Sequence, residues 1–475
     1  MKIFKIYAMA ALVLVSSMLS VGCADNNFEE EITQPKEYEV TLKASLNLGD
    51  MTSRSLTTDG KKTFDEGEQI AVVYSNTKGD KRRAKSDSLC ANDIKDNGKD
   101  AEFTVKLINP SEGADFMIIY PSKMVKEYNL IARGEYPISY SHLIAQDGTL
   151  ETIGKELDYS MYVGKYTGST KKNVSFTLKN QLAILKLTIR DTDKKDITTS
   201  IRRLTILNGD NRYVVNKSSE NVIYVAVRPV TSEQTIKFQT TVGKKLYAKK
   251  VSGKTLQAGK IYPINLIVEE SKPDVQAVDL GLSVKWANMN VGANSETDKG
   301  LMFAWGETVG YSSSDYNDHK FDWANYKFGE YKSLIKYNYT SGFGTVDNKT
   351  VLDPDDDVVT EEYGGSWRMP TKKEFNELCT SDKIESRVYM ENYKGSGVNG
   401  WLFTATNGNS IFMPHAGYRN NPTAGDNNVN EGFYWTSTLG DGSSAKAYCA
   451  NLKLTSTLVY EGLTRNYGMS IRGVK

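Results

Sequence analysis

Short stretches of alternating apolar and polar residues recur between residues 37 and 270. The stretch 40–46 alternates strictly, as do 174–179 and 185–190, and a period of two is typical of β-strands that bury one face. No part of this region keeps a helical period for three turns. Strands separated by turns about every ten residues are typical of antiparallel sandwiches. The pattern therefore predicts a mainly β chain.

The first 22 residues have the layout of an export signal. Lys2 and Lys5 precede an apolar run, 6–19, that is interrupted by two serines. The run is shorter than the roughly 20 apolar residues that cross a bilayer. Its end, Leu19-Ser-Val-Gly-Cys23, resembles the lipobox of bacterial lipoproteins. The resemblance implies removal of residues 1–22 and acylation of Cys23, palmitate included. The alternative is an ordinary secretory signal with a cysteine at the cut.

Residues 23–36 are acidic and polar and have almost no apolar pattern. This composition predicts a disordered tether. An acidic cluster just after the lipid-bearing cysteine also resembles the signal that sends lipoproteins of Bacteroidales-type bacteria to the outer face of the outer membrane. A plain solvated linker is the alternative. We expect a surface-exposed protein, anchored by lipid in the outer membrane.

Charge is nearly balanced along the chain. It has 59 basic and 58 acidic residues, and removal of residues 1–22 takes away two lysines and no acid. The formal net charge therefore changes from +1 to −1. A near-neutral chain gives no electrostatic basis for binding nucleic acid.

Cysteines are few and scattered. Apart from Cys23 the chain has Cys90, Cys379 and Cys449, with no CxxC spacing, and these do not make a disulfide framework. A bond between Cys379 and Cys449 stays open, because both lie in the C-terminal third. We expect two separate buried thiols.

Composition changes near residue 270. The stretch 269–276 is polar and contains a proline, and all six tryptophans lie at or beyond Trp286. Thr371 and Glu374 have the spacing of a capping box at the start of a short helix. These features predict a third, α+β domain. Taken with the resemblances described below, which imply two sandwiches, the expected organisation is a signal (1–22), a tether (23–36), two β-sandwiches (37–170 and 171–270), a linker (271–276) and the third domain (277–475).

Three motifs lie in order along the strand-rich region. They are Phe64-Asp-Glu-Gly-Glu-Gln-Ile-Ala-Val72, Asn180-Gln-Leu-Ala-Ile-Leu-Lys-Leu-Thr-Ile189 and Leu256-Gln-Ala-Gly-Lys-Ile-Tyr-Pro-Ile-Asn-Leu266. Together they resemble fimbrillin-type proteins, the surface lipoproteins and pilus subunits of Bacteroidales-type bacteria. The resemblance implies two transthyretin-like β-sandwiches in tandem. Some members are cut after an arginine near the first strand, which frees a groove for strand exchange with other pilus subunits. Arg54 fits that position; the alternative is an exposed loop arginine.

Six further motifs span the C-terminal region: Asp279-Leu-Gly-Leu-Ser-Val-Lys-Trp-Ala287, Phe303-Ala-Trp-Gly-Glu-Thr308, Gly364-Gly-Ser-Trp-Arg-Met-Pro-Thr371, Gly417-Tyr-Arg419, Tyr434-Trp-Thr-Ser437 and Gly468-Met-Ser-Ile-Arg472. They resemble the Fib-succ major paralogous domain, which is related to the C-type-lectin-like fold shared with formylglycine-generating enzymes. The resemblance implies a compact α+β domain with long loops and no particular ligand. Those enzymes use cysteines late in the fold, where this chain has Cys449 without a companion. We therefore expect no enzyme activity.

An acidic knot lies at residues 353–357. Asp353, Asp355 and Asp357 have the spacing of the first ligands of a calcium-binding EF-hand. The glycine and glutamate that this loop requires are replaced by Val358 and Gly364, which excludes an EF-hand. A different Ca²⁺ loop is the alternative to a solvated turn with Asx-type caps, which we prefer. No cofactor is predicted.

The insert from Tyr311 to Phe343 is rich in aromatic residues among polar ones. Exposed rings can stack on the faces of sugars, and the tyrosine hydroxyl can hydrogen-bond at its tip. The alternative is that most of these rings pack into the core. The predicted ligand surface consists of Tyr316, Trp323, Tyr326, Tyr331 and Tyr337.

Binding is the function that these features predict. We expect an adhesin, or an accessory or tip pilus subunit, that presents its C-terminal domain to a host or bacterial glycan or to a protein. The expected partners are other pilus subunits and, through the lipid, the outer membrane. One alternative is an outer-membrane glycan-capture protein of a polysaccharide-uptake system. The other is a formylglycine-generating-type enzyme, which would require a functional Cys449.

Overall fold

The computed structural model describes most of the chain beyond residue 36. Two units divide the chain, 1–36 and 37–475, and every described residue belongs to the second. Cys23, Arg54 and Tyr316 lie outside the described residues. Within the described part, no helix is long and apolar enough to cross a membrane. The described ranges are 37–47, 63–125, 141–167, 173–209, 211–217, 221–312, 321–420 and 428–475.

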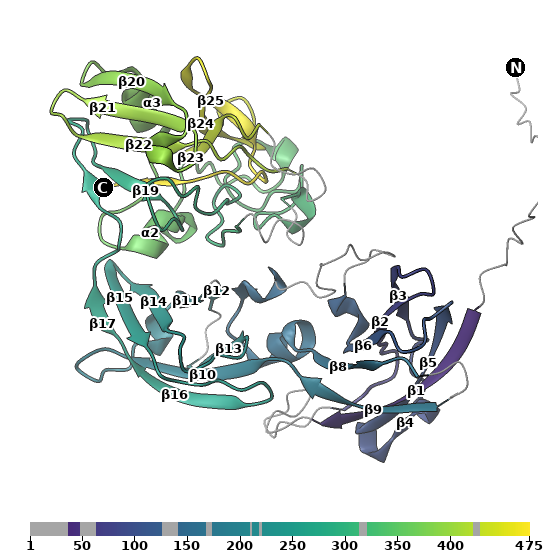
Figure 1. Cartoon of the computed structure of the whole chain (residues 1–475). Helices are drawn as coiled ribbons and strands as arrows, with labels where there is room; N and C mark the ends of the chain where they lie inside the picture. Colours follow the sequence, from purple (N-terminus) through teal and green to yellow (C-terminus); the bar gives the residue numbers. More distant parts are fainter. Residues whose placement is uncertain are drawn as a thin grey trace, which may run out of the picture. The chain divides into compact units, whose positions relative to one another are not determined.

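Strands dominate these residues, which confirms the prediction of a mainly β fold (Figure 1). The first strands form one eight-stranded sheet. β1 lies inside it, antiparallel to β5 and parallel to β9. The sheet order is β3 (Lys81–Lys85), β2 (Ala71–Ser75), β6 (Asp115–Tyr120), β8 (Ser160–Lys165), β9 (Asn173–Asn180), β1 (Glu37–Asn47), β5 (Asp100–Ile108) and β4 (Ile94–Lys95).

The eight-stranded sheet curls over its own core. An isolated bridge between Ser86, just after β3, and Val105 in β5 joins segments from opposite ends of the strand order. Leu42, Phe103 and Ile118 point inward and are almost completely buried. The alternation of the sequence places their polar neighbours on the outer face.

Two further sheets pack around a second core. The three-stranded sheet has the order β13 (Ile223–Val227), β10 (Ala183–Arg190), β16 (Ile261–Ile267), with β10 and β16 parallel. The larger sheet contributes Leu204 and Ile206 to the same core as Leu185 and Leu187 of β10. Its order is β17 (Glu269–Ser271), β15 (Lys245–Val251), β14 (Ile236–Val242), β11 (Arg203–Asn208), β12 (Asn211–Asn216) and β7 (Ala145–Gln146).

Among its described residues, the C-terminal region contains three small sheets, of three strands each, and long connections between them. Trp286, Trp305 and Trp435 are fully buried there. The strands are β18 (Ala277–Val278), β19 (Trp286–Asn290) and β26 (Arg472–Val474); β20 (Ile384–Met390), β21 (Gly400–Ala405) and β22 (Ser410–Pro414); and β23 (Gly432–Leu439), β24 (Lys446–Leu452) and β25 (Thr457–Thr464).

Helices are short throughout the described residues. The predicted capping box is confirmed: the Thr371 hydroxyl accepts from the Glu374 N–H at 3.3 Å, and the Glu374 carboxylate accepts from the Thr371 N–H at 2.8 Å. The α-helices are α1 (Leu150–Thr152), α2 (Val358–Tyr363) and α3 (Lys372–Thr380), and a π-helical turn, η5, covers Ile153–Leu157. The 3₁₀ turns are η1 (Ala91–Asp93), η2 (Asp96–Gly98), η3 (Ser122–Met124), η4 (Ser141–Leu143), η6 (Thr198–Ser200), η7 (Trp323–Asn325), η8 (Ser341–Phe343), η9 (Pro354–Asp356) and η10 (Tyr393–Gly395).

Candidate functional site

From residue 321 to residue 343, the aromatic insert folds as an irregular loop, which two tyrosines anchor to the core. The Tyr326 hydroxyl donates to the Trp305 carbonyl at 2.7 Å. The Tyr337 ring is completely buried, and its centroid lies 5.2 Å from that of Trp305. The prediction that Tyr326 and Tyr337 belong to a ligand surface is therefore wrong. Both rings find partners in the core, so they anchor the loop.

Three other rings of this loop meet nearer the solvent. The side chain of Tyr331 is 50% exposed, and its ring centroid lies 5.7 Å from Trp323 and 5.6 Å from Phe343. Trp323 and Phe343 are half-buried. We call Trp323, Tyr331 and Phe343 the aromatic platform. Two of its members belong to the predicted surface, and Phe343 was missed although it closes the same insert.

The platform rests on a short, hydrogen-bonded frame. Asp322 caps η7 by accepting from the Asn325 N–H at 3.0 Å. The Leu334 N–H donates to the Phe343 carbonyl at 2.7 Å, and the Ile335 N–H donates to the Phe328 carbonyl at 3.0 Å. These bonds hold the platform's segments side by side, because they join residues on both sides of Tyr331.

The carboxylates of the acidic knot turn in different directions. Asp353 pairs with Lys336 at 2.7 Å, whereas Asp355 pairs with Arg202, just before β11, at 2.8 Å. Asp357 is buried and caps α2 by accepting from the N–H groups of Val359 and Thr360. In the described part of the chain, no group of three His, Cys, Asp or Glu side chains is arranged to hold a metal ion. The geometry thus matches the Asx-type cap at Asp357, and it gives no support for a Ca²⁺ loop.

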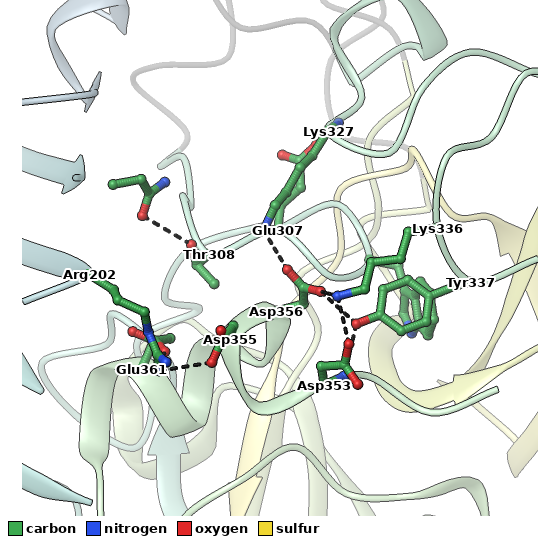
Figure 2. A network of polar contacts seen from close by, with 12 residues as sticks. Arg202, Glu307, Thr308, Lys327, Lys336, Tyr337, Asp353, Asp355, Asp356 and Glu361 are labelled. Atoms are coloured by element: carbon green, nitrogen blue, oxygen red, sulfur yellow. Dashed lines mark hydrogen bonds and ion pairs between the residues drawn. The ribbon is translucent and has the colours of Figure 1, made fainter. Parts of the chain in front are cut away.

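Asp356, between these residues, makes the densest set of polar contacts. Its Oδ1 accepts from Lys327 Nζ at 2.7 Å, and its Oδ2 accepts from Lys336 Nζ and the Tyr337 hydroxyl, both at 2.6 Å (Figure 2). Asp356 is buried. Burial alone raises the pKa of its carboxyl, but these three donors outweigh burial and lower it. Sequence reasoning missed Asp356, since spacing alone selects its odd-numbered neighbours.

Helix α2 continues the acidic stretch onto the outer face of the β11–β12–β14 sheet. Glu362 is buried and accepts from Arg203 Nη2 at 2.8 Å and also from Arg212. Burial raises the pKa of Glu362, but the two guanidinium groups reverse this and hold it at about 2. Thr241 and Gln239 of β14 donate to the carbonyls of Glu361 and Glu362, respectively. The contact of Glu362 with Arg203 and Arg212 is therefore ionised at neutral pH, and it joins residues about 150 positions apart in the sequence.

A pocket of about 210 Å³ lies beside this contact. Arg202 bridges Asp355 and Glu361 along its wall, and Lys327 faces Asp356 (Figure 2). Cations and carboxylates therefore neutralise one another around it, which suits a structural contact better than capture of a charged ligand. Its lining consists of Arg202, Arg203, Asn216, Lys217, Thr308, Lys327, Asp355, Asp356 and Glu361.

Cys379 and Cys449 are free and buried, which confirms the prediction of two separate thiols. Burial raises the pKa of Cys449 to about 12 and that of Cys379 to about 11. Because the thiolate is the nucleophilic form of cysteine, Cys449 is unsuited to nucleophilic chemistry at neutral pH.

No family model and no curated protein matches this chain. Several solved structures are weakly similar. A fimbrial assembly protein of Parabacteroides distasonis has 11% identity and a TM-score of 0.31, with 48% of this chain and 91% of that chain covered. A fimbrial protein of Bacteroides ovatus has 12% identity and a TM-score of 0.24, with 92% and 98% covered. The tip fimbrial protein Mfa3 of Porphyromonas gingivalis has 12% identity and a TM-score of 0.23, with 45% and 82% covered. At such scores the likeness is too weak to assign a family or a function.

Proposed function

We propose that the protein is a surface-exposed lipoprotein that acts as an adhesin or as an accessory pilus subunit. Its C-terminal region, which resembles the Fib-succ and C-type-lectin-like domains, presents the ligand-binding surface. The aromatic platform is the observation that carries this proposal. It presents an exposed tyrosine ring flanked by two further rings, and tyrosine and tryptophan are enriched at binding interfaces.

A glycan is the ligand class that suits the platform best. The apolar faces of sugar rings stack on aromatic rings, and the Tyr331 hydroxyl is available to donate to a sugar oxygen. The surrounding loop residues Asn325, Glu330 and Lys332 are exposed and supply further hydrogen-bonding groups. The alternative ligand for the same rings is an exposed aromatic residue of a protein partner.

The proposed lipid anchor and the proposed assembly with other subunits both depend on the N-terminal part of the chain. An acylated Cys23 would hold the chain in the outer membrane. A cut after Arg54 would separate β1 from the rest of the chain, and departure of β1 would leave β5 and β9 as open strand edges. Open edges pair with strands of other subunits, because their N–H and C=O groups lack partners. Mass analysis of the N-terminus of protein from cells decides between an acylated Cys23 and a start at Ser55.

Binding to a glycan array by the full chain tests the ligand proposal. Tyr331→Ala and Trp323→Ala are expected to weaken binding about tenfold each, because each removes a stacking ring. Tyr460→Ala is the matched control, since Tyr460 is an exposed tyrosine on β25, outside the aromatic loop. Equal binding by all three variants would overturn the assignment of the platform.

A glycan-capture protein of a polysaccharide-uptake system is the second candidate, because the platform would suit a soluble polysaccharide equally well. Binding of soluble polysaccharide without adhesion of cells to glycan-coated surfaces would favour it. The enzyme alternative loses its nucleophile, because Cys449 is buried with a raised pKa.

A further inference from the structure

The segment 327–336 carries Tyr331, and both of its ends contact one carboxylate. Lys327 Nζ lies 2.7 Å from Asp356 Oδ1, and Lys336 Nζ lies 2.6 Å from Asp356 Oδ2. Each oxygen of this buried group thus receives one lysine. Two residues nine positions apart in the sequence are drawn together at one point, as Figure 2 shows.

The contact of Asp356 with the two lysines consists of charged groups that are partly shielded from solvent. Asp356 is 5% exposed, whereas the side chains of Lys327 and Lys336 are 41% and 29% exposed. The Tyr337 hydroxyl, a third donor, belongs to a ring of the core. Charge-assisted hydrogen bonds are about twice as strong as neutral ones. Removal of the Asp356 carboxylate would take from Lys327 the carboxylate that it contacts and would leave Lys336 paired with Asp353 alone, so that nothing would draw the two lysines to one point.

Asp355, the preceding residue, points elsewhere. It pairs with Arg202, just before β11, on the side of the sheet, while Asp356 faces the aromatic loop (Figure 2). The backbone positions of the two residues are adjacent in η9, so a change in either perturbs the same turn. The pair therefore offers a matched comparison of a loop contact with a sheet contact.

We propose that Asp356 is a positioning residue that clamps both ends of segment 327–336 and thereby presets the aromatic platform for its ligand. The consequence for ligand binding rests on the proposed function, but the clamp itself does not. Binding surfaces that are ordered beforehand lose less conformational entropy on association. The clamp supplies this order at a loop that has no strand pairing of its own between Lys327 and Ser333.

Trypsin and acrylamide report on the clamp in the full chain without any ligand. Trypsin cleaves after Lys332, which lies within the clamped segment and is exposed. Acrylamide quenches mainly Trp323, because the other five tryptophans are buried. Asp356→Asn is expected to raise the rate of cleavage after Lys332 about tenfold and to increase quenching, since the loop opens locally once its charged contacts are lost.

Asp355→Asn is the matched control and should leave cleavage after Lys332 unchanged. Lys336→Arg keeps the positive donor and should retain protection, whereas Lys336→Met should lose it. If Lys336 only stabilised the fold, variants with equal thermal stability would be cleaved after Lys332 at equal rates. If Asp356→Asn does not fold, Lys327→Gln and Lys336→Met test the two ends separately.

The clamp would be overturned if trypsin cleaved Asp356→Asn after Lys332 within twofold of the wild-type rate. It would also be overturned if Asp355→Asn raised cleavage and quenching as much as Asp356→Asn does. Failure of the glycan array to show binding would overturn the proposed ligand site and leave the clamp intact. If the glycan array shows binding that depends on the platform, but Asp356→Asn changes neither cleavage nor quenching, the clamp is overturned and the ligand site stands. The two proposals therefore fail in distinguishable ways.

Discussion

The cores of the strand-rich region, 37–270, and of the C-terminal region, 276–475, are built from different kinds of side chain. The first buries aliphatic side chains such as Leu42 and Leu185, which alternate with polar residues along regular strands. The second also buries Arg465 and Arg472 completely. Arg472 donates to the carbonyls of Ala287 and Phe412 at 2.9 Å, 185 and 60 residues away in the sequence. A repeating local pattern thus specifies the first core, whereas polar groups matched over long distances complete the second.

Arg472→Ala is expected to have the largest effect. The variant removes the buried donors that reach the Asn290 side-chain oxygen and two carbonyls, and we expect a loss of about 4 kcal/mol in the free energy of unfolding. Arg387→Ala is the control, because Arg387 also donates to carbonyls but is partly exposed, so that water can replace it. Urea denaturation measures both. Equal losses would contradict the role of burial in the comparison.

Leu185→Ala should affect the aliphatic core somewhat less. Leu185 is 1% exposed, and truncation of a buried leucine costs about 3 kcal/mol through lost contacts and a residual cavity. Val163→Ala, at a side chain that is 59% exposed, should change stability by less than about 0.5 kcal/mol. A loss at Leu185 that matched the control would show that the strand-rich core tolerates cavities.

Glu362→Gln tests the ionised contact between the two regions. The change removes the charge that Arg203 and Arg212 share, and a loss of about 2 kcal/mol is expected because two guanidinium groups are left near one another. Glu269→Gln, in an exposed pair with Lys249, should leave the stability almost unchanged, because water and salt screen exposed ion pairs. Thermal melts at neutral pH compare the two. A Glu362→Gln variant as stable as the control would show that this contact adds no stability.

The pH dependence of stability should be the smallest of these effects. Burial raises the pKa of Glu307 from 4.5 to about 7, so the folded chain binds this proton more tightly than the unfolded chain does. The stability that Glu307 contributes is therefore complete when the pH is below the pKa of its carboxyl in the unfolded chain, and it is lost as the pH rises through about 7. Between about pH 5 and about pH 8 we expect a loss of about 1 kcal/mol, reduced by the partial exposure of the side chain. Glu307→Gln should flatten the curve, and an unchanged curve would exclude Glu307 as its source.

Local patterns predicted the strands well. The alternating stretches 174–179 and 185–190 lie within β9 and β10, and the capping box starts α3 where its spacing indicated. These predictions succeeded because a strand that buries one face, and a helix end that needs an acceptor, impose requirements within a few neighbouring residues.

Predictions of the candidate site were less successful. The sequence places aromatic residues in one insert, but it does not say that Tyr326 and Tyr337 turn into the core while Tyr331 turns outward. Likewise, the spacing of Asp353, Asp355 and Asp357 suggests a common ligand, whereas their partners are Lys336, Arg202 and backbone N–H groups. The directions depend on distant segments, which no local pattern contains.

By itself, the sequence determined a mainly β chain, the position of a capped helix and the aromatic character of one long insert. Only the tertiary structure decided which rings reach the solvent and which carboxylate holds the loop. The physical reason is that alternation and capping are satisfied between near neighbours. Burial of a ring or a charge, in contrast, is settled by whichever distant groups supply its contacts, as Asp356 does for Lys327 and Lys336.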